Sequence, residues 1–353
     1  MNIRITLIGL LTLTIGTGAM AEKKELVLNP QHPEQYVVAQ GDTLWDVAGK
    51  FLKDPWLWPE LWAAGDGSTR ILHPGDVLRL SQVDGKPRLL LNDPGTAPRR
   101  RGGALPVVKL SPKVRATDIS GEIPVIPLST IRAFLSSPKV VEESTLDNAP
   151  YLLALADGRS VAGTGEKIYV QGVDAADQSA YGLFHKGKPF LDGDSGDELG
   201  YEAIQVADVS LLQEGDPAIF QINHAFREVK AGDRLLPLDD ERVPSRYEPH
   251  APDVELKGHI VGIMGDAPHV GHYSVVVVDK GGNDGLEVGH VLDVTRNNRV
   301  VPDTRSNNPY EEITLPPEVV GNLLIFRTFE RVSFGLIMKA SLGLTVGDVV
   351  QTP

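Results

Sequence analysis

Histidine and aspartate residues between positions 259 and 290 are the side chains in this sequence that could together bind zinc. Imidazole nitrogens and carboxylate oxygens are common zinc ligands in proteins. The group comprises His259, His269, His272 and His290, with Asp266 and Asp279. His269 and His272 lie in a segment rich in Gly and Pro, without the Glu of the His-Glu-x-x-His helix that zinc peptidases use. The spacing therefore favours surface loop histidines over a metal site.

A second motif, Gly193-Asp194-Ser195-Gly196, resembles the turn that carries the nucleophile of serine peptidases. It belongs to an acidic run, and no upstream histidine stands in a recognisable context, although a catalytic serine needs a histidine base. A solvated turn is the favoured interpretation. From Asp192 to Glu198 the carboxylates also alternate as they do in calcium loops, but Gly196 falls where a ligand should be. Calcium binding by this loop stays an open alternative.

Other catalytic classes lack their residues. The chain has no cysteine, which excludes cysteine peptidases, L,D-transpeptidases of the cell wall, thiolate zinc sites and disulfides. A glycosidase needs two carboxylates that face each other, and pairs such as Glu142-Glu143 lie in no helical frame that provides this. We therefore expect a protein without catalytic residues, resident metal or cofactor.

The bulk composition narrows the remaining classes. The 353 residues are enough for two or three domains, and the formal charge of −13 repels nucleic acid. The 36 Gly and 26 Pro residues break helices, so most of the chain should consist of short strands joined by turns.

Residues 1–21 have the pattern of a signal peptide. Arg4 precedes a short apolar run from Ile5 to Ile15, and Ala19-Met20-Ala21 fits the small-x-small cleavage pattern. We expect cleavage after Ala21 and a mature protein in the periplasm; an uncleaved anchor helix is the alternative. No later stretch approaches the roughly 20 apolar residues of a membrane span, so none is expected after cleavage.

The elements that carry the most specific motif lie between residues 35 and 82. A β-branched strand at 36–38 is followed by Gly41 and by Asp42, which we expect to cap a helix. One helical apolar face comprises Leu44, Val47, Ala48 and Phe51. Asp54-Pro55 begins a second helix, and a strand follows at 77–80. The predicted order is β-α-α-β.

The string Tyr36-Val37-Val38-x-x-Gly41-Asp42-Thr43-Leu44-Trp45, closed by Pro74-Gly75-Asp76-Val77-Leu78, resembles a LysM domain. The resemblance implies a shallow groove for N-acetylglucosamine chains of peptidoglycan, formed by the loops before the first helix and after the second. Glycine lets a sugar approach the backbone, and donors at a helix start can meet N-acetyl carbonyls. The implied contacts are Gly41, Asp42, Thr43, Leu44, Thr69, Arg70, Ile71 and Leu72.

All four tryptophans lie in this segment, at positions 45, 56, 58 and 62. Aromatic faces suit pyranose rings, so they could form a sugar platform. They could equally fill the core of a very small domain or present an apolar patch to a partner, and the core is the favoured interpretation. Trp56 is the best candidate for an exposed aromatic contact.

The run Lys53-Asp54-Pro55-Trp56-x-Trp58-Pro59-Glu60-x-Trp62 makes the chain similar to the TsaP family, LysM proteins associated with the secretin of type IV pili. The tail, from Gly321 through Ser333-x-Gly335-Leu336-Ile337 to Val350, resembles the C-terminal domain of the flagellar T protein, which that family also carries. The resemblance implies a tether between peptidoglycan and an outer-membrane secretin. A LysM-targeted cell-wall hydrolase, or a structural protein that serves another envelope machine, are the alternatives.

The predicted architecture is α+β: a small βααβ LysM module at 35–82, a linker at 83–118, and two mostly-β domains of small-barrel or SH3-like character at 119–245 and 252–353. Both domains carry a recurring Gly-polar-apolar pattern, as in Gly232-Asp233 and Gly347-Asp348. The pattern predicts tight turns with Gly at positive φ that lead into half-buried strands. Runs at 274–278 and 323–326 predict strands buried on both faces.

Overall fold

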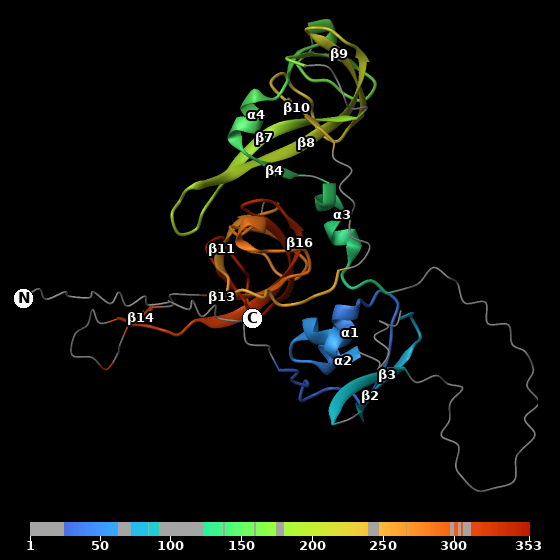
Figure 1. Ribbon diagram of the computed structural model, residues 1–353, viewed down its shortest axis with the longest axis vertical. Coiled ribbons are helices and arrows are strands. Elements are labelled where there is room, and N and C mark those ends of the chain that lie inside the picture. The colour runs from blue at the N-terminus through green and yellow to red at the C-terminus, as the bar shows by residue number, and fades with distance from the viewer. Residues whose placement is uncertain are drawn as a thin grey trace, which may run out of the picture.

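The computed structural model describes residues 25–62, 72–83, 85–91, 123–136, 138–158, 160–173, 180–238, 247–265, 267–296, 300–302, 305 and 312–353. Over these residues the protein is mostly strand with short helices, and one group of strands forms a closed barrel (Figure 1). The predicted mostly-β character is confirmed. The predicted signal peptide lies outside the described residues.

The N-terminal module spans a small sheet and its covering helices. Its elements are β1 (Gln35–Val37), α1 (Leu44–Phe51), the 3-10 helix η1 (Pro55–Leu57), α2 (Trp58–Trp62), β2 (Val77–Val83) and β3 (Lys86–Leu91). β2 pairs antiparallel with both β1 and β3. β3 lies within the 83–118 range predicted as a linker, so that range begins with a paired strand.

Helix α1 begins one residue later than the sequence indicated. Thr43 is its N-cap: the Thr43 hydroxyl accepts the Asp46 N–H at 3.1 Å, and the Asp46 carboxylate accepts the Thr43 N–H at 3.1 Å. The expectation that Asp42 caps the helix is wrong. The Asp42 carboxylate instead accepts the Ala39 N–H and the Tyr36 hydroxyl, both at 2.8 Å, and so closes the turn before the helix.

The recurring Gly-polar pattern forms the predicted turn at four of its five places. Gly75, Gly232, Gly289 and Gly347 all have φ between +94° and +102°. In each turn the side chain after the glycine accepts the backbone N–H of the residue three positions before it. The four pairs are Asp76 with His73, Asp233 with Lys230, His290 with Glu287, and Asp348 with Thr345. Positive φ at the third position is what a type II turn requires, which explains the glycine. At the fifth place, Gly215-Asp216, φ of Gly215 is +159° and the Asp216 carboxylate accepts from Gln171 and Gly172 instead.

The middle domain is a sheet that closes on itself. Its elements are β4 (Lys139–Val141), α4 (Glu143–Asn148), β5 (Tyr151–Leu155), η2 (Ala156–Gly158), β6 (Lys167–Gln171), β7 (Tyr181–Leu191), β8 (Glu198–Gln213), β9 (Ala218–Ala225) and β10 (Arg234–Pro237). The sheet order is β4-β8-β7-β10-β5-β6-β9, and β9 also pairs with β8, so the strands other than β4 form a ring. Helix α3 (Leu128–Ser136) precedes this domain.

The C-terminal domain is a closed barrel in the order β11-β12-β17-β16-β13-β18. These strands are β11 (Lys257–Ile263), β12 (Val275–Val278), β13 (Val291–Arg296), β16 (Glu318–Thr328), β17 (Ser333–Ala340) and β18 (Val349–Gln351). The 3-10 helix η3 (Gly282–Asp284) follows β12, and β14 (Val300–Pro302) pairs with β15 (Glu312–Thr314) outside the barrel.

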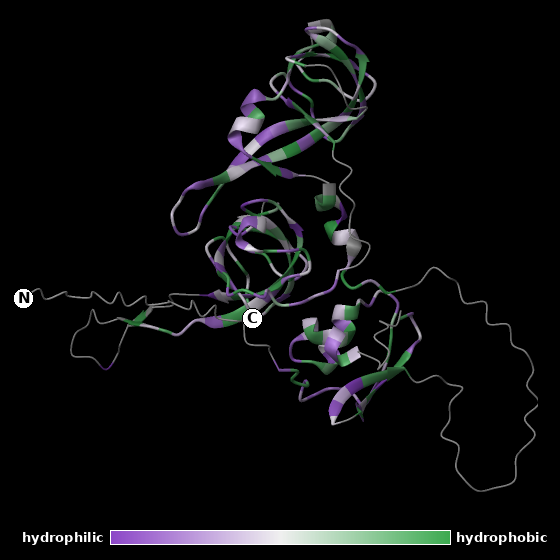
Figure 2. Cartoon of the chain, viewed as in Figure 1, coloured by the Kyte–Doolittle hydropathy of each residue, from purple (hydrophilic) through white to green (hydrophobic). Residues whose placement is uncertain are grey.

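Strands buried on both faces occur where they were predicted. Val276 and Val278 belong to the apolar cluster of the barrel, whereas Val275 and Val277 belong to a second cluster that includes the core of the N-terminal module. Apolar and polar residues are interspersed along the strands of all three units (Figure 2). Within the described residues, none of the helices has the length and apolar character needed to span a bilayer.

Candidate binding site

The first predicted loop lies directly before α1. Gly41 has φ +93°, is exposed, and has no other atom within 4 Å of the position a Cβ would take. Thr43 and Leu44 are buried, at 3% and 7% exposure, and Asp42 is half-buried. The loop is therefore open to solvent at Gly41 and buried from Thr43 onward.

The second predicted loop is described only at its end. Leu72 is buried, at 1% exposure, whereas Thr69, Arg70 and Ile71 lie outside the described residues. The Leu72 side chain belongs to the core of the module, and its carbonyl accepts the backbone N–H of Ile123 at 2.9 Å.

Residues 123–126, which we call the strap, bridge the two loops. The Leu44 N–H donates to the Pro124 carbonyl at 2.9 Å, and the Trp45 N–H donates to the Val125 carbonyl at 3.4 Å. Figure 1 shows this segment passing beside α1 before it enters α3. The donors at the helix start, which the sequence suggested for N-acetyl carbonyls, thus hold main-chain carbonyls of the same protein.

The tryptophans form the core of the module. Their exposed fractions are 3%, 4%, 4% and 7% for Trp45, Trp56, Trp58 and Trp62. The expectation that Trp56 is an exposed aromatic contact is wrong, because η1 begins at the buried Pro55 and its residues 55–57 all turn into the core. The favoured interpretation of Trp58 and Trp62 as core residues is confirmed.

The N-terminal module also contacts the C-terminal barrel. The Tyr273 hydroxyl lies 3.3 Å from both carboxylate oxygens of Asp46, the residue that completes the α1 capping box. Burial, together with the negative charge of Asp46, raises the pKa of Tyr273 to about 12. Tyr273 has φ +64°, an uncommon conformation for a bulky residue, and its ring stacks on His272 with centroids 3.6 Å apart. A cavity of about 420 Å³ lies beside this contact, with Trp45, Lys50 and Lys339 in its lining.

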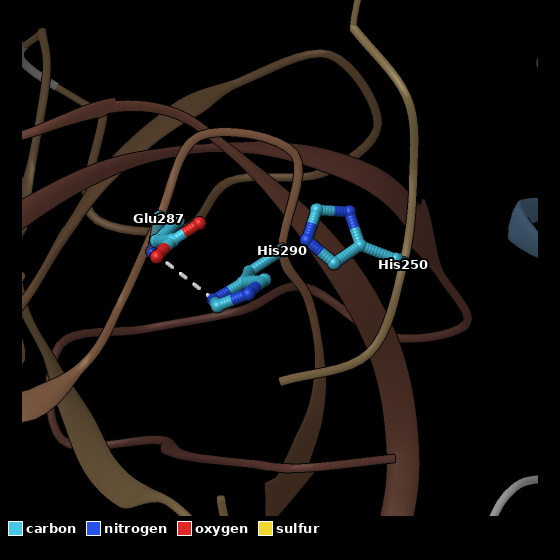
Figure 3. Close-up of side chains that lie close together, drawn as sticks. All are labelled: His250, Glu287 and His290. Carbon is cyan, nitrogen blue, oxygen red and sulfur yellow. Dashed lines mark hydrogen bonds between the residues drawn. The ribbon is translucent and has the colours of Figure 1, made fainter. Parts of the chain in front are cut away.

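The structure does not gather the histidines that the sequence grouped. Instead His290 lies near His250 and Glu287, with the two imidazole rings 4.6 Å apart (Figure 3). His290 Nδ1 accepts the Glu287 N–H at 3.0 Å, so the neutral ring carries its proton on Nε2 and has no lone pair left for a metal. Burial is the main cause that lowers the pKa of His290, and the charge of the neighbouring His250 lowers it further. His290 occupies the position that aspartate holds in the other Gly-polar turns, which explains it without a metal.

The Ser195 turn is engaged in local structure. Its hydroxyl donates to Asp192 Oδ1 at 3.2 Å, and the Asp194 and Ser195 N–H groups donate to the same oxygen. These backbone bonds lower the pKa of Asp192, and Lys280 Nζ lies 3.9 Å from its other oxygen. Both oxygens of the Asp192 carboxylate already have partners, which disfavours calcium binding by this loop. In the described part of the chain, no hydrogen bond joins Ser195 to a histidine.

The half-buried His259 and the buried Asp279 form a pair next to this turn. His259 Nδ1 lies 3.2 Å from Asp279 Oδ2, and the same carboxylate oxygen accepts the Gly193 N–H at 3.0 Å. A Cβ at Gly193 would lie 2.4 Å from the His259 ring. The pair therefore holds the tip of the β7–β8 hairpin against the C-terminal barrel.

Sequence reasoning missed the strap, Trp45 as a backbone donor, and the contact between Asp46 and Tyr273. Only the apolar run Ile123-Pro124-Val125-Ile126 hinted at a buried segment. No protein-family model matches this chain, and no curated protein matches it.

Proposed function

We propose that this protein is a non-catalytic tether that binds peptidoglycan in the periplasm through the groove between the first loop and Leu72. The observation that carries the proposal is the pattern of main-chain groups in that groove. Two N–H donors, from Leu44 and Trp45, and one carbonyl acceptor, from Leu72, are occupied by peptide groups of the strap. The acetamido group of N-acetylglucosamine offers the same two functions, one carbonyl and one N–H, so the groove has the chemistry to bind it.

The resemblance to LysM modules supports the same ligand. The turn at Gly41 and the capping box at Thr43 and Asp46 direct the first donors of α1, the Leu44 and Trp45 N–H groups, toward the strap. A single module of this size offers few contacts, so its affinity for one glycan chain is expected to be weak. Several copies in one assembly would multiply that affinity through avidity.

The second end of the proposed tether is the C-terminal region, and its proposed partner is the outer-membrane secretin of type IV pili. The support is the resemblance of the tail to the flagellar T domain, with the Trp-rich run of the TsaP family. A deletion strain distinguishes this partner from another envelope machine: loss of secretin assembly supports the secretin, and intact pili with another envelope defect contradict it.

Peptidoglycan binding is tested by co-sedimentation with purified sacculi. The protein used is the chain from residue 22 onward. Gly41→Trp places a large side chain at the open first loop and should reduce binding, and N-acetylglucosamine oligomers should compete with the sacculi. Gly347→Trp is the matched control, because Gly347 has φ +95° and equally open surroundings but lies in the C-terminal barrel. Equal binding by the two variants would contradict the groove as the site.

A further inference from the structure

The strap lies against the start of α1 and against Leu72, the two sides of the proposed groove. Its three main-chain hydrogen bonds reach both predicted loops: Ile123 N–H to Leu72, and the Pro124 and Val125 carbonyls to the start of α1. Its side chains are buried as well, with Ile123, Val125 and Ile126 at 4%, 6% and 0% exposure and in the same apolar cluster as the module's core.

We infer that the strap and a glycan chain compete for the groove, so that this protein is closed toward peptidoglycan until residues 123–126 leave. The inference rests on the proposed function, since it concerns regulation of that same site. A main-chain N–H has one proton, so an N–H that donates to the Pro124 or Val125 carbonyl cannot at the same time form a full hydrogen bond to an acetamido carbonyl. The Leu72 carbonyl already accepts the Ile123 N–H, so an acetamido N–H would have to share that oxygen.

The strap has a built-in advantage over a free ligand. It belongs to the same chain as the groove, so it competes at an effective concentration that for intramolecular contacts is on the order of millimolar. The apparent affinity for glycan is then the intrinsic affinity multiplied by the fraction of molecules whose strap is out. If that fraction is about one in a hundred, release of the strap strengthens binding about 100-fold.

The strap is also connected to the C-terminal barrel through α3. Arg327, a buried residue of β16, donates from Nη1 to the Phe134 carbonyl at 3.3 Å and to the Pro138 carbonyl at 2.9 Å. These two carbonyls lie at the C-terminal end of α3 and just beyond it, whereas the strap lies just before its start. A partner that displaces α3 from the barrel would therefore also displace the strap. Binding of a partner to the C-terminal region would then be coupled to access of glycan to the groove.

Val125→Asp tests the inference, because it places a charge in the buried strap without altering a groove residue. Val161→Asp is the matched control: it makes the same change at a residue of the middle domain that is 43% exposed. In sacculus co-sedimentation of the full chain, Val125→Asp should bind at least about tenfold more tightly than wild type and Val161→Asp. Damage to the fold would weaken binding, so the expected gain has the opposite sign.

A reversible lock provides the second measurement. The chain has no cysteine, so Leu72→Cys with Ile123→Cys creates a single disulfide between residues whose main chains are already hydrogen-bonded. The oxidised protein should not bind sacculi, and reduction should restore binding to the wild-type level or above.

Three outcomes decide between the claims. Tighter binding by Val125→Asp with loss of binding in the oxidised lock supports the strap as a competitor. Equal binding by wild type, Val125→Asp and the oxidised lock would overturn the competition between strap and glycan, but would leave the proposed peptidoglycan binding intact. Failure of every form, the released and reduced ones included, overturns the proposed function and the competition with it.

Discussion

The backbone N–H of Leu44, at the start of α1, donates to the carbonyl of Pro124 at 2.9 Å, although a predicted linker separates the two residues in sequence. In the proposed function, Leu44 belongs to the loop that would bind N-acetyl groups, and the Pro124 carbonyl is the amide group that this N–H holds in the structure. The proposed site and the segment that covers it are therefore parts of one polypeptide.

Thr43→Ala should destabilise the N-terminal module by about 1 kcal/mol, because it removes the capping box of α1. Urea unfolding followed by tryptophan fluorescence measures this directly, since all four tryptophans lie between positions 45 and 62. Thr345→Ala, in the C-terminal barrel, is the control. An unchanged midpoint for Thr43→Ala would show that the cap contributes nothing to stability.

Tyr273→Phe should lessen the loss of stability in alkali. The unfolded chain releases a tyrosine proton near pH 10.0, whereas the folded protein holds the Tyr273 proton to about pH 12. Its contribution is therefore complete below pH 10 and is lost as the pH rises toward 12. Burial is also the main cause that raises the pKa values of Tyr36 and Tyr247 to about 12. These two tyrosines remain in the variant, so part of the loss of stability in alkali remains as well. Thermal unfolding from pH 9 to 12 should show a shallower decline for the variant; parallel curves would contradict the account.

His290→Asp should fold as well as wild type, because aspartate fills this position in three other Gly-polar turns. His290→Ala should cost about 1–2 kcal/mol, since the Glu287 N–H loses its acceptor. Differential scanning calorimetry of the three proteins at pH 7.5 compares them. A defect in His290→Asp as large as in His290→Ala would contradict the shared turn.

The same residue predicts an acid sensitivity. Burial lowers the pKa of His290 below its usual 6.5, so below pH 6.5 the unfolded chain takes up a proton that the folded chain resists. Stability from this group is thus present above pH 6.5 and is lost as the pH falls through the lowered value. His290→Asn should lose less stability than wild type between pH 7 and 5, measured by thermal unfolding. A wild-type curve that is flat there, or a steeper one for the variant, would argue against a buried neutral imidazole.

Zinc should not bind the His250, Glu287 and His290 cluster tightly, because His290 Nδ1 is already an acceptor. Addition of stoichiometric zinc should leave the thermal transition unchanged. A saturable increase that His290→Asn abolishes would mean that the ring gives up its hydrogen bond for the metal.

Local patterns predicted much of this fold, and for physical reasons. Gly at the third position of a tight turn and a run such as Val275–Val278 are set by φ and by burial, which act over a few residues. The cap of α1 was misplaced because Asp42 and Thr43 are both good caps, and only the position of Asp46 selects Thr43. The strap could not be predicted, because the bond between Leu44 and Pro124 depends on the path of the chain between them.

Amide chemical shifts of Leu44 and Trp45 test the central claim most directly, that this groove binds N-acetylglucosamine chains. The full chain, labelled with ¹⁵N-leucine and ¹⁵N-tryptophan, would be titrated with an N-acetylglucosamine tetramer, in wild type and in Val125→Asp. The account predicts saturable shifts at these two amides, at lower ligand concentration in Val125→Asp than in wild type, with the Trp58 amide unmoved. The account is contradicted if the Leu44 and Trp45 signals stay unchanged in both proteins at tetramer concentrations that are high enough to saturate the site.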